Sequence, residues 1–388
     1  MVDRGDKALK KKVLFVIVNM EIGGTRTSLL NLLKYMDKIP NIEIDLLVLD
    51  HSGPYFDRIP SKVNILPEFK ILSAALPTEN QKNWIEKIYR VFIYILKSIF
   101  GYKKIYGIIY KKIANKCRSY DCVIGYQEGL SNDCASYIKA KKHISWIHND
   151  FKNWYNAKYY INKVYNNSDH IIFVADAARK DFVDNNPILE EKCEIIKNTI
   201  IEETLLRKSN SEYDCYKKNT IKFVSVGRVC TQKAYERIPS IARKLYKDGY
   251  VFEWHIIGNG EQIDSLRREV KQLKLENSVF FDGATDNPYP IIKNADLLVC
   301  VSLYESQPMV ILEALTLGVP VMTTRFSSAE ELLSDKPYGV ICDNDSESIY
   351  MELKKILDNP NCITTMKNET KAYKYDNDGI IREILSKI

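Results

Sequence analysis

Two glutamates, eight positions apart, are the residues whose type and spacing point most directly to chemistry. Glu305 is followed directly by Ser306, Gln307, Pro308, Met309 and Val310, and Glu313 lies further along. Pro308 suits a first helical turn, so we expect Glu305 in the loop before a helix and Glu313 inside it. N–H groups at the helix start favour a phosphate, which leaves Glu313 to bind vicinal hydroxyls and Glu305 to bind sugar hydroxyls. The alternative is an ordinary charged helix start.

Two cations form the second chemical feature. Arg228 follows Gly227 at the end of an apolar run, and Lys233 lies five residues further on. The planar fork of arginine and the point charge of lysine both bind phosphate oxygens. A leaving diphosphate gains negative charge, and preorganised cations can then stabilise the transition state by several kcal/mol. The alternative is a solvated surface pair.

Two pairs of glycines lie where turns after strands are expected. Gly23 and Gly24 would let the backbone come close to a diphosphate or an acceptor, and Gly258 and Gly260 occupy a similar turn further along. A pair of glycines is weak evidence by itself, because many turns need glycine for steric reasons alone. We treat all four as candidate ligand-binding residues.

The elements that must position these residues form two series of strands alternating with helices. In the first half, apolar stretches predict strands over 12–19, 43–49, 122–125, 142–147 and 170–174, with a helix over 25–35. In the second half, they predict strands over 221–226, 252–257, 279–282, 297–301, 319–323 and 340–342, with helices over 234–248 and 262–275. Such alternation predicts doubly wound parallel sheets.

The predicted fold class is therefore α/β, with two Rossmann-like domains that face each other across a cleft. Residues 1–200 form the N-terminal domain, and the polar stretch 201–220 is interpreted as a linker. Residues 221–370 form the C-terminal domain. Residues 371–388 form a C-terminal helix that could cross back to the N-terminal domain.

The composition excludes several classes of protein. Of the 388 residues, 45% are hydrophobic and 27% are charged, which suits two ordinary cores and gives no case for disorder. No apolar run approaches the ~20 residues of a membrane span, and the polar N-terminus lacks a convincing signal-peptide cleavage site. The nine cysteines include no Cys-x-x-Cys pair, which argues against a disulfide scaffold and suits reduced thiols in a cytosol.

These motifs, and the order in which they follow one another along the chain, resemble the signature of the family 4 retaining glycosyltransferases (glycosyltransferase group 1), which have the GT-B fold. In that family the two glutamates lie between an "Ala-Asp-hydrophobic-Ser" strand and a "Gly-x-Pro-Val" strand, here residues 295–302 and 318–321. Further matches are Gly227-Arg228 with Lys233, Gly258-Asn-Gly260, the helix opening at Gly23-Gly24 and the turn at Ile147-His148. The resemblance spans roughly residues 12–340 and is stronger after residue 221.

The resemblance implies a retaining, metal-independent hexosyltransferase whose substrate is a UDP- or GDP-sugar, with no cofactor. It implies that Arg228, Lys233, Glu305 and His148 are catalytic, with His148 against the donor sugar. It assigns donor binding to Gly23, Gly24, Gly258, Gly260, Ser306, Gln307, Pro308, Met309, Val310 and Glu313. The chain departs from the family at Arg26, where a glutamate is common, and this departure points to an anionic group on the acceptor.

A competing metal motif is present but weak. Asp343-Asn-Asp345 follows a predicted strand, and an Asp-x-Asp after a strand is how metal-dependent glycosyltransferases of GT-A fold hold manganese. The motif lies near the C-terminus, whereas the nucleotide domain of that fold opens the chain. We therefore interpret it, and likewise Asp376-Asn-Asp378, as a solvated turn. The five histidines include no His-x-x-His pair.

Residues 82–116, here called the basic segment, contain nine basic residues and one acid, a local charge of +8 in a chain of net charge +6. Apolar residues recur at helical spacing over the same stretch. A basic, aromatic-rich amphipathic helix is typical of an anionic membrane interface, and the alternative is a core-packed helix with a solvated basic face. Candidate membrane contacts are Ile85, Phe92, Lys97, Lys103, Lys104, Lys111 and Lys112. No nucleic-acid-binding motif accompanies the patch.

These features predict an enzyme that transfers a sugar to a saccharide acceptor, itself linked to a lipid, in bacterial capsular or exopolysaccharide biosynthesis. We expect it in the cytoplasm, at the inner face of the plasma membrane. The alternatives are a GT-B sugar-nucleotide epimerase or phosphorylase, which product analysis would separate from a transferase, and a non-catalytic sugar-nucleotide-binding membrane scaffold. The intact Glu305, Glu313, Arg228 and Lys233 argue against a decayed site.

Overall fold

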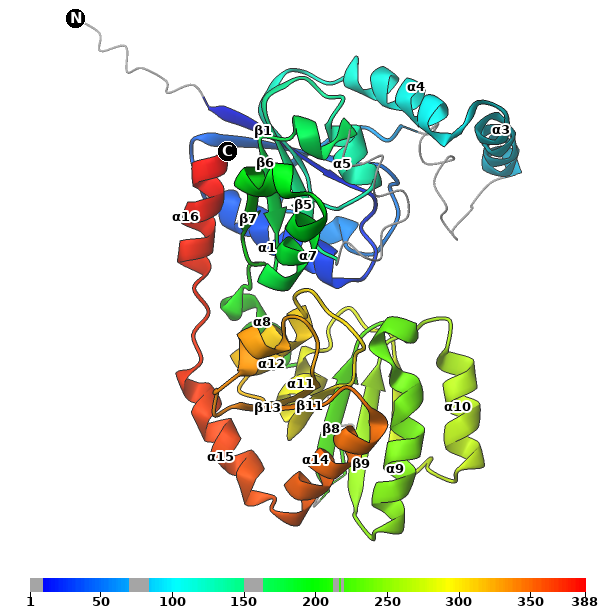
Figure 1. The fold of residues 1–388 in the computed structure, drawn as a ribbon, viewed down its shortest axis with the longest axis vertical. Coiled ribbons are helices and arrows are strands. Elements are labelled where there is room, and N and C mark those ends of the chain that lie inside the picture. The colour runs from blue at the N-terminus through cyan, green and yellow to red at the C-terminus, as the bar shows by residue number, and fades with distance from the viewer. Residues whose placement is uncertain (1–9, 70–83, 150–162, 212–215, 218–219) are drawn as a thin grey trace, which may run out of the picture. The chain divides into compact units, whose positions relative to one another are not determined.

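The computed structural model describes residues 10–69, 84–149, 163–211, 216–217 and 220–388. The chain divides into two compact units, of which the first comprises residues 1–199 and 378–388 and the second comprises residues 200–377. Each unit is built around one parallel sheet that carries helices (Figure 1).

The sheet of the first unit has seven strands in the order β3-β2-β1-β4-β5-β6-β7, and every pairing is parallel. The strands are β1 (Lys11–Ile17), β2 (Ile42–Val48), β3 (Asn64–Ile65), β4 (Tyr120–Gly125), β5 (Ala140–Ile147), β6 (His170–Phe173) and β7 (Cys193–Ile195). Strand β1 lies between β2 and β4 and is buried from Val13 to Ile17, as its continuous apolar sequence predicts. The sequence did not predict the short strands β3 and β7.

The helices of the first unit connect these strands, and one more returns from the C-terminus. They are α1 (Gly24–Met36), α3 (Trp84–Phe100), α4 (Tyr102–Ala114), α5 (Leu130–Ala135), α7 (Asp176–Asn185) and α16 (Asn377–Lys387), with 3₁₀ turns at Phe56–Arg58, Tyr165–Asn167 and Pro187–Lys192. The end of α16 is fixed to the sheet, because Lys11 donates to the carbonyl of Ile388 at 2.7 Å and Lys142 to that of Lys387 at 3.0 Å. Residues 378–388 therefore belong to the first unit.

The sheet of the second unit has six parallel strands in the order β10-β9-β8-β11-β12-β13. The strands are β8 (Ile221–Val226), β9 (Phe252–Ile257), β10 (Val279–Gly283), β11 (Leu297–Cys300), β12 (Val321–Thr324) and β13 (Gly339–Cys342). In both sheets the strand order reverses beside the first strand of the unit, which is the arrangement of a Rossmann-like fold.

Helices cover both faces of this second sheet (Figure 1). The core on one face contains side chains of α9 (Ile238–Lys247), α10 (Ile263–Gln272) and α14 (Ser346–Asp358). The core on the other contains side chains of α8 (Glu202–Ser209), α11 (Tyr289–Asn294), α12 (Met309–Thr316) and α13 (Ala329–Leu333). Neighbouring strand residues such as Phe223 and Val224 point into opposite cores. The remaining helix is α15 (Asn361–Glu369), and 3₁₀ turns lie at Thr231–Lys233, Tyr235–Arg237 and Thr370–Ala372.

The stretch 201–220 differs from the linker that its polar composition suggests. It contains helix α8, and the buried Leu205 of that helix packs in the same core as Ile292 of α11 and Ile311 of α12. The stretch belongs to the second unit. A single buried leucine in a short charged helix is a weak periodic signal, which explains why sequence composition alone indicates a linker.

Candidate functional site

The candidate residues of the second unit lie in loops at the carboxyl ends of adjacent strands. Arg228 follows β8, the turn at Gly258–Gly260 follows β9, and Glu305 follows β11. Because these strands are parallel neighbours, their loops meet at one edge of the sheet, where open α/β sheets bind ligands. The β8 and β11 loops are also joined directly, since the Leu303 N–H donates to the Gln232 carbonyl at 2.8 Å.

The glycines after β8 and β9 allow these two loops to pack closely. Gly258 has a φ of +148°, and a Cβ there would lie 1.8 Å from the carbonyl oxygen of Gly227. A Cβ on Gly260 would lie 2.2 Å from the carbonyl oxygen of Val229. The glycines predicted to bind donor therefore have a steric task, which is to hold the segment that carries Arg228.

Lys233 and Glu305 form an ion pair at this edge. The Lys233 ammonium donates to Glu305 Oε1, and the Ser302 hydroxyl donates to the same oxygen at 2.8 Å. Only 18% of the Lys233 side chain and 9% of the Glu305 side chain are exposed. Burial lowers the pKa of Lys233, but the charge and hydrogen bond of Glu305, together with the effects of Cys300 and Cys230, outweigh it, so the pKa lies above its ordinary value and the amine stays charged. Arg228, by contrast, is exposed to solvent.

Glu313 lies inside α12 and is buried. The Tyr289 hydroxyl donates to Glu313 Oε1 at 3.3 Å. Burial raises the pKa of Glu313 to about 7, and the bond from Tyr289 and the charge of Lys208 on α8 partly oppose that rise. At neutral pH this carboxyl is therefore close to its titration point, whereas an exposed glutamate is fully ionised.

The start of α12 differs slightly from the prediction. The helix begins at Met309, and Pro308 is its N-cap residue and makes no side-chain cap bond. Proline has no N–H, so the row of donors expected over residues 306–310 has a gap. Ser306 is buried, and the Gln307 side chain donates to the Tyr375 hydroxyl at 3.2 Å. The remaining N–H groups of the first turn of α12 are the ones that could meet a phosphate.

In the first unit, His148 follows β5 and is buried. Its backbone N–H donates to the Glu128 carboxylate at 2.9 Å, and its ring lies 5.0 Å from that of Tyr126. Burial, and secondarily the charge of Arg26, lower the pKa of His148 to about 3. Its Nε2 makes no hydrogen bond within the described part of the chain. His148 is therefore a neutral ring whose Nε2 could form a hydrogen bond with a ligand hydroxyl. Asp150, which belongs to the same sequence motif, lies outside the described residues.

Gly23 and Gly24 open helix α1. Gly23 is the N-cap residue, and a Cβ on it would meet no atom within 4 Å, so the backbone there faces open space. Arg26, one turn away, donates to Asn19 Oδ1 at 2.8 Å. This bond fixes the guanidinium beside the helix start, where a positive side chain and the helix dipole both favour an anion.

The Asp343-Asn-Asp345 motif is occupied by structural contacts. Asp345 caps α14 by accepting from the Ser348 N–H at 2.9 Å, and Asp343 pairs with Arg325 at 3.2 Å. The Asn344 amide donates to backbone carbonyls of neighbouring loops. Over the ranges that the structure describes, no three His, Cys, Asp or Glu side chains are grouped so as to hold a metal ion.

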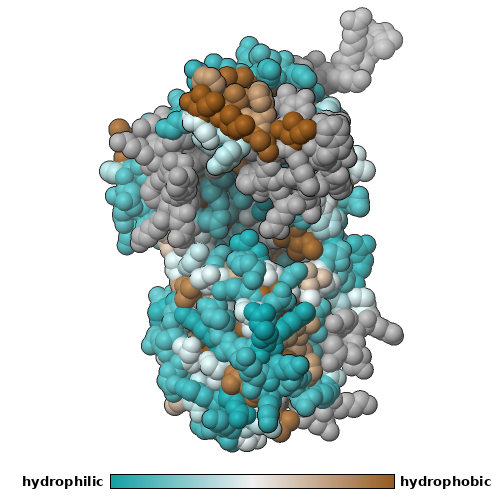
Figure 2. All heavy atoms as spheres, turned by 90° about the vertical axis from the view of Figure 1, so that its right-hand side faces the viewer, coloured by the Kyte–Doolittle hydropathy of each residue, from teal (hydrophilic) through white to brown (hydrophobic). Residues whose placement is uncertain are grey.

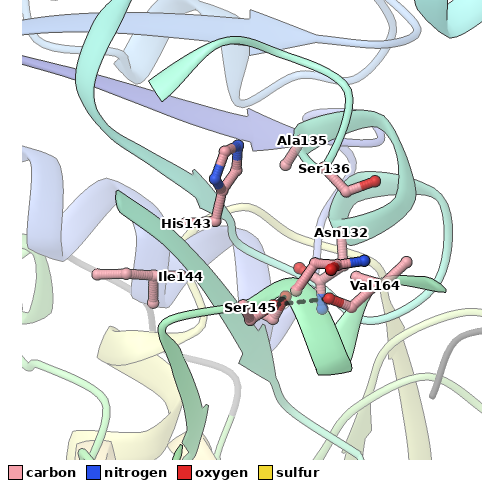
Figure 3. A pocket seen from close by; sticks show the side chains of 9 residues that line it. Asn132, Ala135, Ser136, His143, Ile144, Ser145 and Val164 are labelled. Carbon is pink, nitrogen blue, oxygen red and sulfur yellow. Dashed lines mark hydrogen bonds between the residues drawn. The ribbon is translucent and has the colours of Figure 1, made fainter. Parts of the chain in front are cut away.

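A small cavity of about 70 Å³ lies elsewhere in the first unit (Figure 3). Asn132, His143 and Ser145 are among its lining residues, and Ser145 bonds Ser168 at 2.8 Å across it. A nucleotide-sized ligand needs several hundred Å³, whereas this volume suits a few water molecules. The cavity contains none of the candidate residues, and we assign no substrate to it.

The basic segment forms two helices with different surroundings. In α4, Ile105, Tyr106, Ile109, Tyr110 and Ile113 are buried in the core of the first unit, while Lys103, Lys104, Lys111 and Lys112 are exposed. Helix α4 is thus the core-packed helix of the alternative interpretation. Lys97 on α3 is half-buried, and its ammonium donates to the Tyr106 hydroxyl at 2.9 Å, so its contact with a membrane stays a prediction.

Helix α3, in contrast, is largely exposed along its apolar side chains. The exposed set is Ile88, Val91, Phe92, Tyr94, Ile95, Ile99 and Phe100. Ile93 is buried and joins the core that contains α4. Figure 2 shows the resulting apolar patch in brown, with hydrophilic surface beside it. Ile85, another candidate membrane contact, is not among the residues whose side chains the structure describes.

Among the described helices, none has the length and apolar content that crossing a membrane requires.

Comparisons with known proteins agree with the geometry. Residues 214–375 match the family model described as glycosyl transferases group 1. A Campylobacter jejuni relative, N-acetylgalactosamine-N,N'-diacetylbacillosaminyl-diphospho-undecaprenol 4-alpha-N-acetylgalactosaminyltransferase, is 29% identical over 210 residues, which is 53% of this chain and 56% of the relative. The putative colanic acid biosynthesis glycosyltransferase WcaL of Escherichia coli is 26% identical over 43% of this chain and 44% of its own length. The matched region thus spans about half the length of these curated relatives.

Solved structures cover nearly the whole chain. Anabaena HepE in complex with UDP and glucose superposes with a TM-score of 0.73 over 97% of this chain and 98% of that one, at 14% identity. Staphylococcus aureus TarM, in a complex with UDP, superposes with a TM-score of 0.72 over 97% and 99%, at 13% identity. These likenesses establish the fold, and the predicted fold class is confirmed. The chain has the GT-B fold, and its residues 214–375 match the group 1 glycosyltransferases.

Proposed function

We propose that the protein is a retaining glycosyltransferase that moves a sugar from a nucleoside-diphospho-sugar to a saccharide acceptor linked to a lipid. The observation that carries the proposal is the buried Lys233–Glu305 pair at the carboxyl edge of the second sheet, beside Arg228 and the start of α12. The first turn of α12 and Arg228 suit a diphosphate, and the carboxylates of Glu305 and Glu313 suit hydroxyls.

In this proposal the bond between the anomeric carbon and the diphosphate oxygen breaks, and the leaving diphosphate takes the electron pair. The acceptor hydroxyl forms the new bond on the same face, and its proton passes to the leaving oxygen. Arg228 and Lys233 stabilise the growing negative charge. His148, neutral because its pKa lies at about 3, offers its ring nitrogen to a sugar hydroxyl. No step assigned to these residues requires a metal ion.

The acceptor assignment rests on two features of the first unit. Arg26 at the start of α1 favours an anionic group such as the diphosphate of a lipid carrier. The exposed apolar face of α3, next to exposed lysines of α4, suits the interface of an anionic membrane. The names of relatives point the same way, since one acts on a diphospho-undecaprenol and another is assigned to colanic acid biosynthesis. We therefore propose a role in bacterial surface polysaccharide biosynthesis at the inner face of the plasma membrane.

We expect one sugar nucleotide from a panel of UDP- and GDP-sugars to raise the melting temperature of the protein, because a ligand that binds the native state stabilises it. The same compound should act as donor to an extracted lipid-linked saccharide, with retained anomeric configuration in the product by NMR. Activity should persist in excess EDTA. Release of free nucleotide with an altered sugar and no transfer would instead support an epimerase, and loss on chelation that manganese restores would refute metal independence.

Membrane binding should depend on the exposed lysines of α4. Changing Lys103, Lys104, Lys111 and Lys112 together to Gln should release the protein from vesicles that contain anionic lipid, because each basic residue near such a surface contributes about 1 kcal/mol. Donor binding should be unchanged, because none of the proposed donor contacts lies on α4. Co-sedimentation with vesicles of phosphatidylcholine alone or with added phosphatidylglycerol measures the effect.

A matched control separates local from overall charge. Changing Lys247, Lys271, Lys274 and Lys367, which are exposed in the second unit, to Gln removes the same charge and should leave vesicle binding intact. Ile95→Ser with Ile99→Ser should also weaken binding, because these side chains are 48% and 66% exposed and would lose burial in the interface. If all these variants sediment equally with anionic vesicles, or if the wild type does not sediment with them, the protein reaches its acceptor without this surface.

A further inference from the structure

The side chain of Asn344 joins three loops at the carboxyl edge of the second sheet. Its amide nitrogen lies 2.9 Å from the carbonyl oxygen of Leu303, 3.2 Å from that of Arg325 and 3.3 Å from that of Ser302. These carbonyls belong to the loops after β11 and β12, while Asn344 itself follows β13. One amide group thus holds three neighbouring strand ends together.

Arg237, just before α9, fixes the orientation of this amide. Its Nη1 donates to Asn344 Oδ1 at 2.6 Å, and its Nη2 donates to the Asn344 backbone carbonyl at 3.4 Å. A flipped amide would place its oxygen against three carbonyl oxygens and its NH₂ against a guanidinium. Only a side chain with an acceptor on one branch and a donor on the other fits both neighbours, and an aspartate lacks the donor.

Two of the residues that Asn344 contacts are themselves bonded to Glu305 or to the residue next to Lys233, the two members of the candidate catalytic pair. The Ser302 carbonyl, which also accepts from the Thr324 hydroxyl at 2.6 Å, belongs to the residue whose hydroxyl holds Glu305 Oε1. The Leu303 N–H donates to the carbonyl of Gln232, the residue before Lys233. On the far side of the same loop, the hydroxyls of Ser327 and Ser328 donate to the Glu305 carbonyl at 3.0 and 3.2 Å.

We propose that Asn344, oriented by Arg237, is a positioning residue that sets the place of the Glu305 loop and with it the Lys233–Glu305 pair. The proposal rests on the proposed function, because it assigns the loop a role in transfer. Without the amide donor the carbonyls of Ser302 and Leu303 lose a partner, and the loop can settle differently. A shift of about 1 Å at a reacting group is enough to slow an enzyme by up to about 10²-fold.

The test is Asn344→Asp, which keeps the size of the side chain but removes the donor. The new carboxylate can pair with Arg237, so the fold should hold while the three carbonyls lose their hydrogen bonds. We expect kcat for the donor found in the sugar-nucleotide panel to fall on the order of ten-fold, with a smaller change in KM. Backbone amides of residues 302–306 should exchange hydrogen faster by mass spectrometry.

The control is Asp345→Ala in the same motif, which removes the α14 cap. It should lower the melting temperature without changing kcat measured well below that temperature. A normal kcat with normal hydrogen exchange in Asn344→Asp would overturn the proposal, as would a fall in kcat that Asp345→Ala reproduces. If Asn344→Asp does not fold, Arg237→Lys, which keeps the charge and loses the fork, must show the faster exchange. A wild-type protein that transfers no sugar would refute the proposed function instead, and the exchange measurement would still test the positioning.

Discussion

Replacing Lys233 by alanine is expected to lower both the stability of the protein and the rate of transfer by more than any other single substitution at the site. The change leaves the Glu305 carboxylate, 9% exposed, without its cation. Removing one partner of a buried ion pair typically destabilises a protein by about 3 kcal/mol or more, which corresponds to a melting-temperature fall of roughly 6–12 °C for a unit of this size. Transfer should fall about 10²–10³-fold, because a cation aimed at the leaving diphosphate is lost.

Two further variants separate these effects. The double variant Lys233→Ala/Glu305→Gln lacks the glutamate charge that Lys233→Ala alone leaves unpaired. It should therefore be nearly as stable as Glu305→Gln alone while remaining inactive. Lys244→Ala breaks a comparable pair with Glu347 on the surface, where both side chains are about half exposed, and it should change stability by less than about 1 kcal/mol. Equal melting temperatures for Lys233→Ala and Lys244→Ala would show that breaking the buried pair costs no more stability than breaking the surface pair.

Much of the framework of the site follows from the sequence. Strands β8 and β9 have the predicted bounds, because each is a short run of mostly apolar residues that ends at a glycine, Gly227 or Gly258. The same runs place Arg228, Gly258 and Glu305 at strand ends, and parallel strands bring those ends together. Lys233 close to Glu305 could be predicted only through the family resemblance, since residues 72 positions apart show no pattern in one sequence.

The side chains that surround the site could not be predicted in this way. Tyr289 and Lys208 act on Glu313 from α11 and α8, and α8 itself was interpreted as part of a linker. Asn344 lies in a motif that suggests a metal or a solvated turn, whereas its amide meets three carbonyls. These contacts depend on how loops from different strands meet, which the periodicity of one element does not record.

The basic segment shows what helical periodicity predicts and what it does not. Apolar residues recur at three and four positions in both α3 and α4, yet Ile109 and Ile113 are buried while Ile95 and Ile99 are exposed. Periodicity indicates that a helix has an apolar face, but it does not say whether that face meets the protein's own core or an outside surface. The structure separates the two halves of the segment and confines the proposed membrane face to α3 and the exposed lysines of α4.

Glu313→Ala is expected to weaken donor binding by about ten-fold or more, equivalent to roughly 1.4 kcal/mol, because a carboxylate that accepts two hydroxyls makes charge-assisted bonds. Arg228→Ala should lower transfer by at least a similar factor but act mainly on kcat, since its charge is needed as the diphosphate leaves. Both variants are compared through kcat and donor KM at pH 8. Near-normal constants in both would remove these residues from the site.

The pH dependence of donor binding distinguishes Glu313 from every other candidate. Burial raises the pKa of Glu313 to about 7, so in the free protein the carboxyl is mostly protonated at pH 6 and mostly ionised at pH 8. If the ionised form binds the two hydroxyls, donor affinity should rise about ten-fold between these pH values, because one proton must leave before binding. The diphosphate of a sugar nucleotide does not titrate in this range, so it adds no slope of its own. Arg228→Ala should keep the slope, whereas Glu313→Gln, which cannot ionise, should abolish it; a slope that survives in Glu313→Gln would assign the titration to another group.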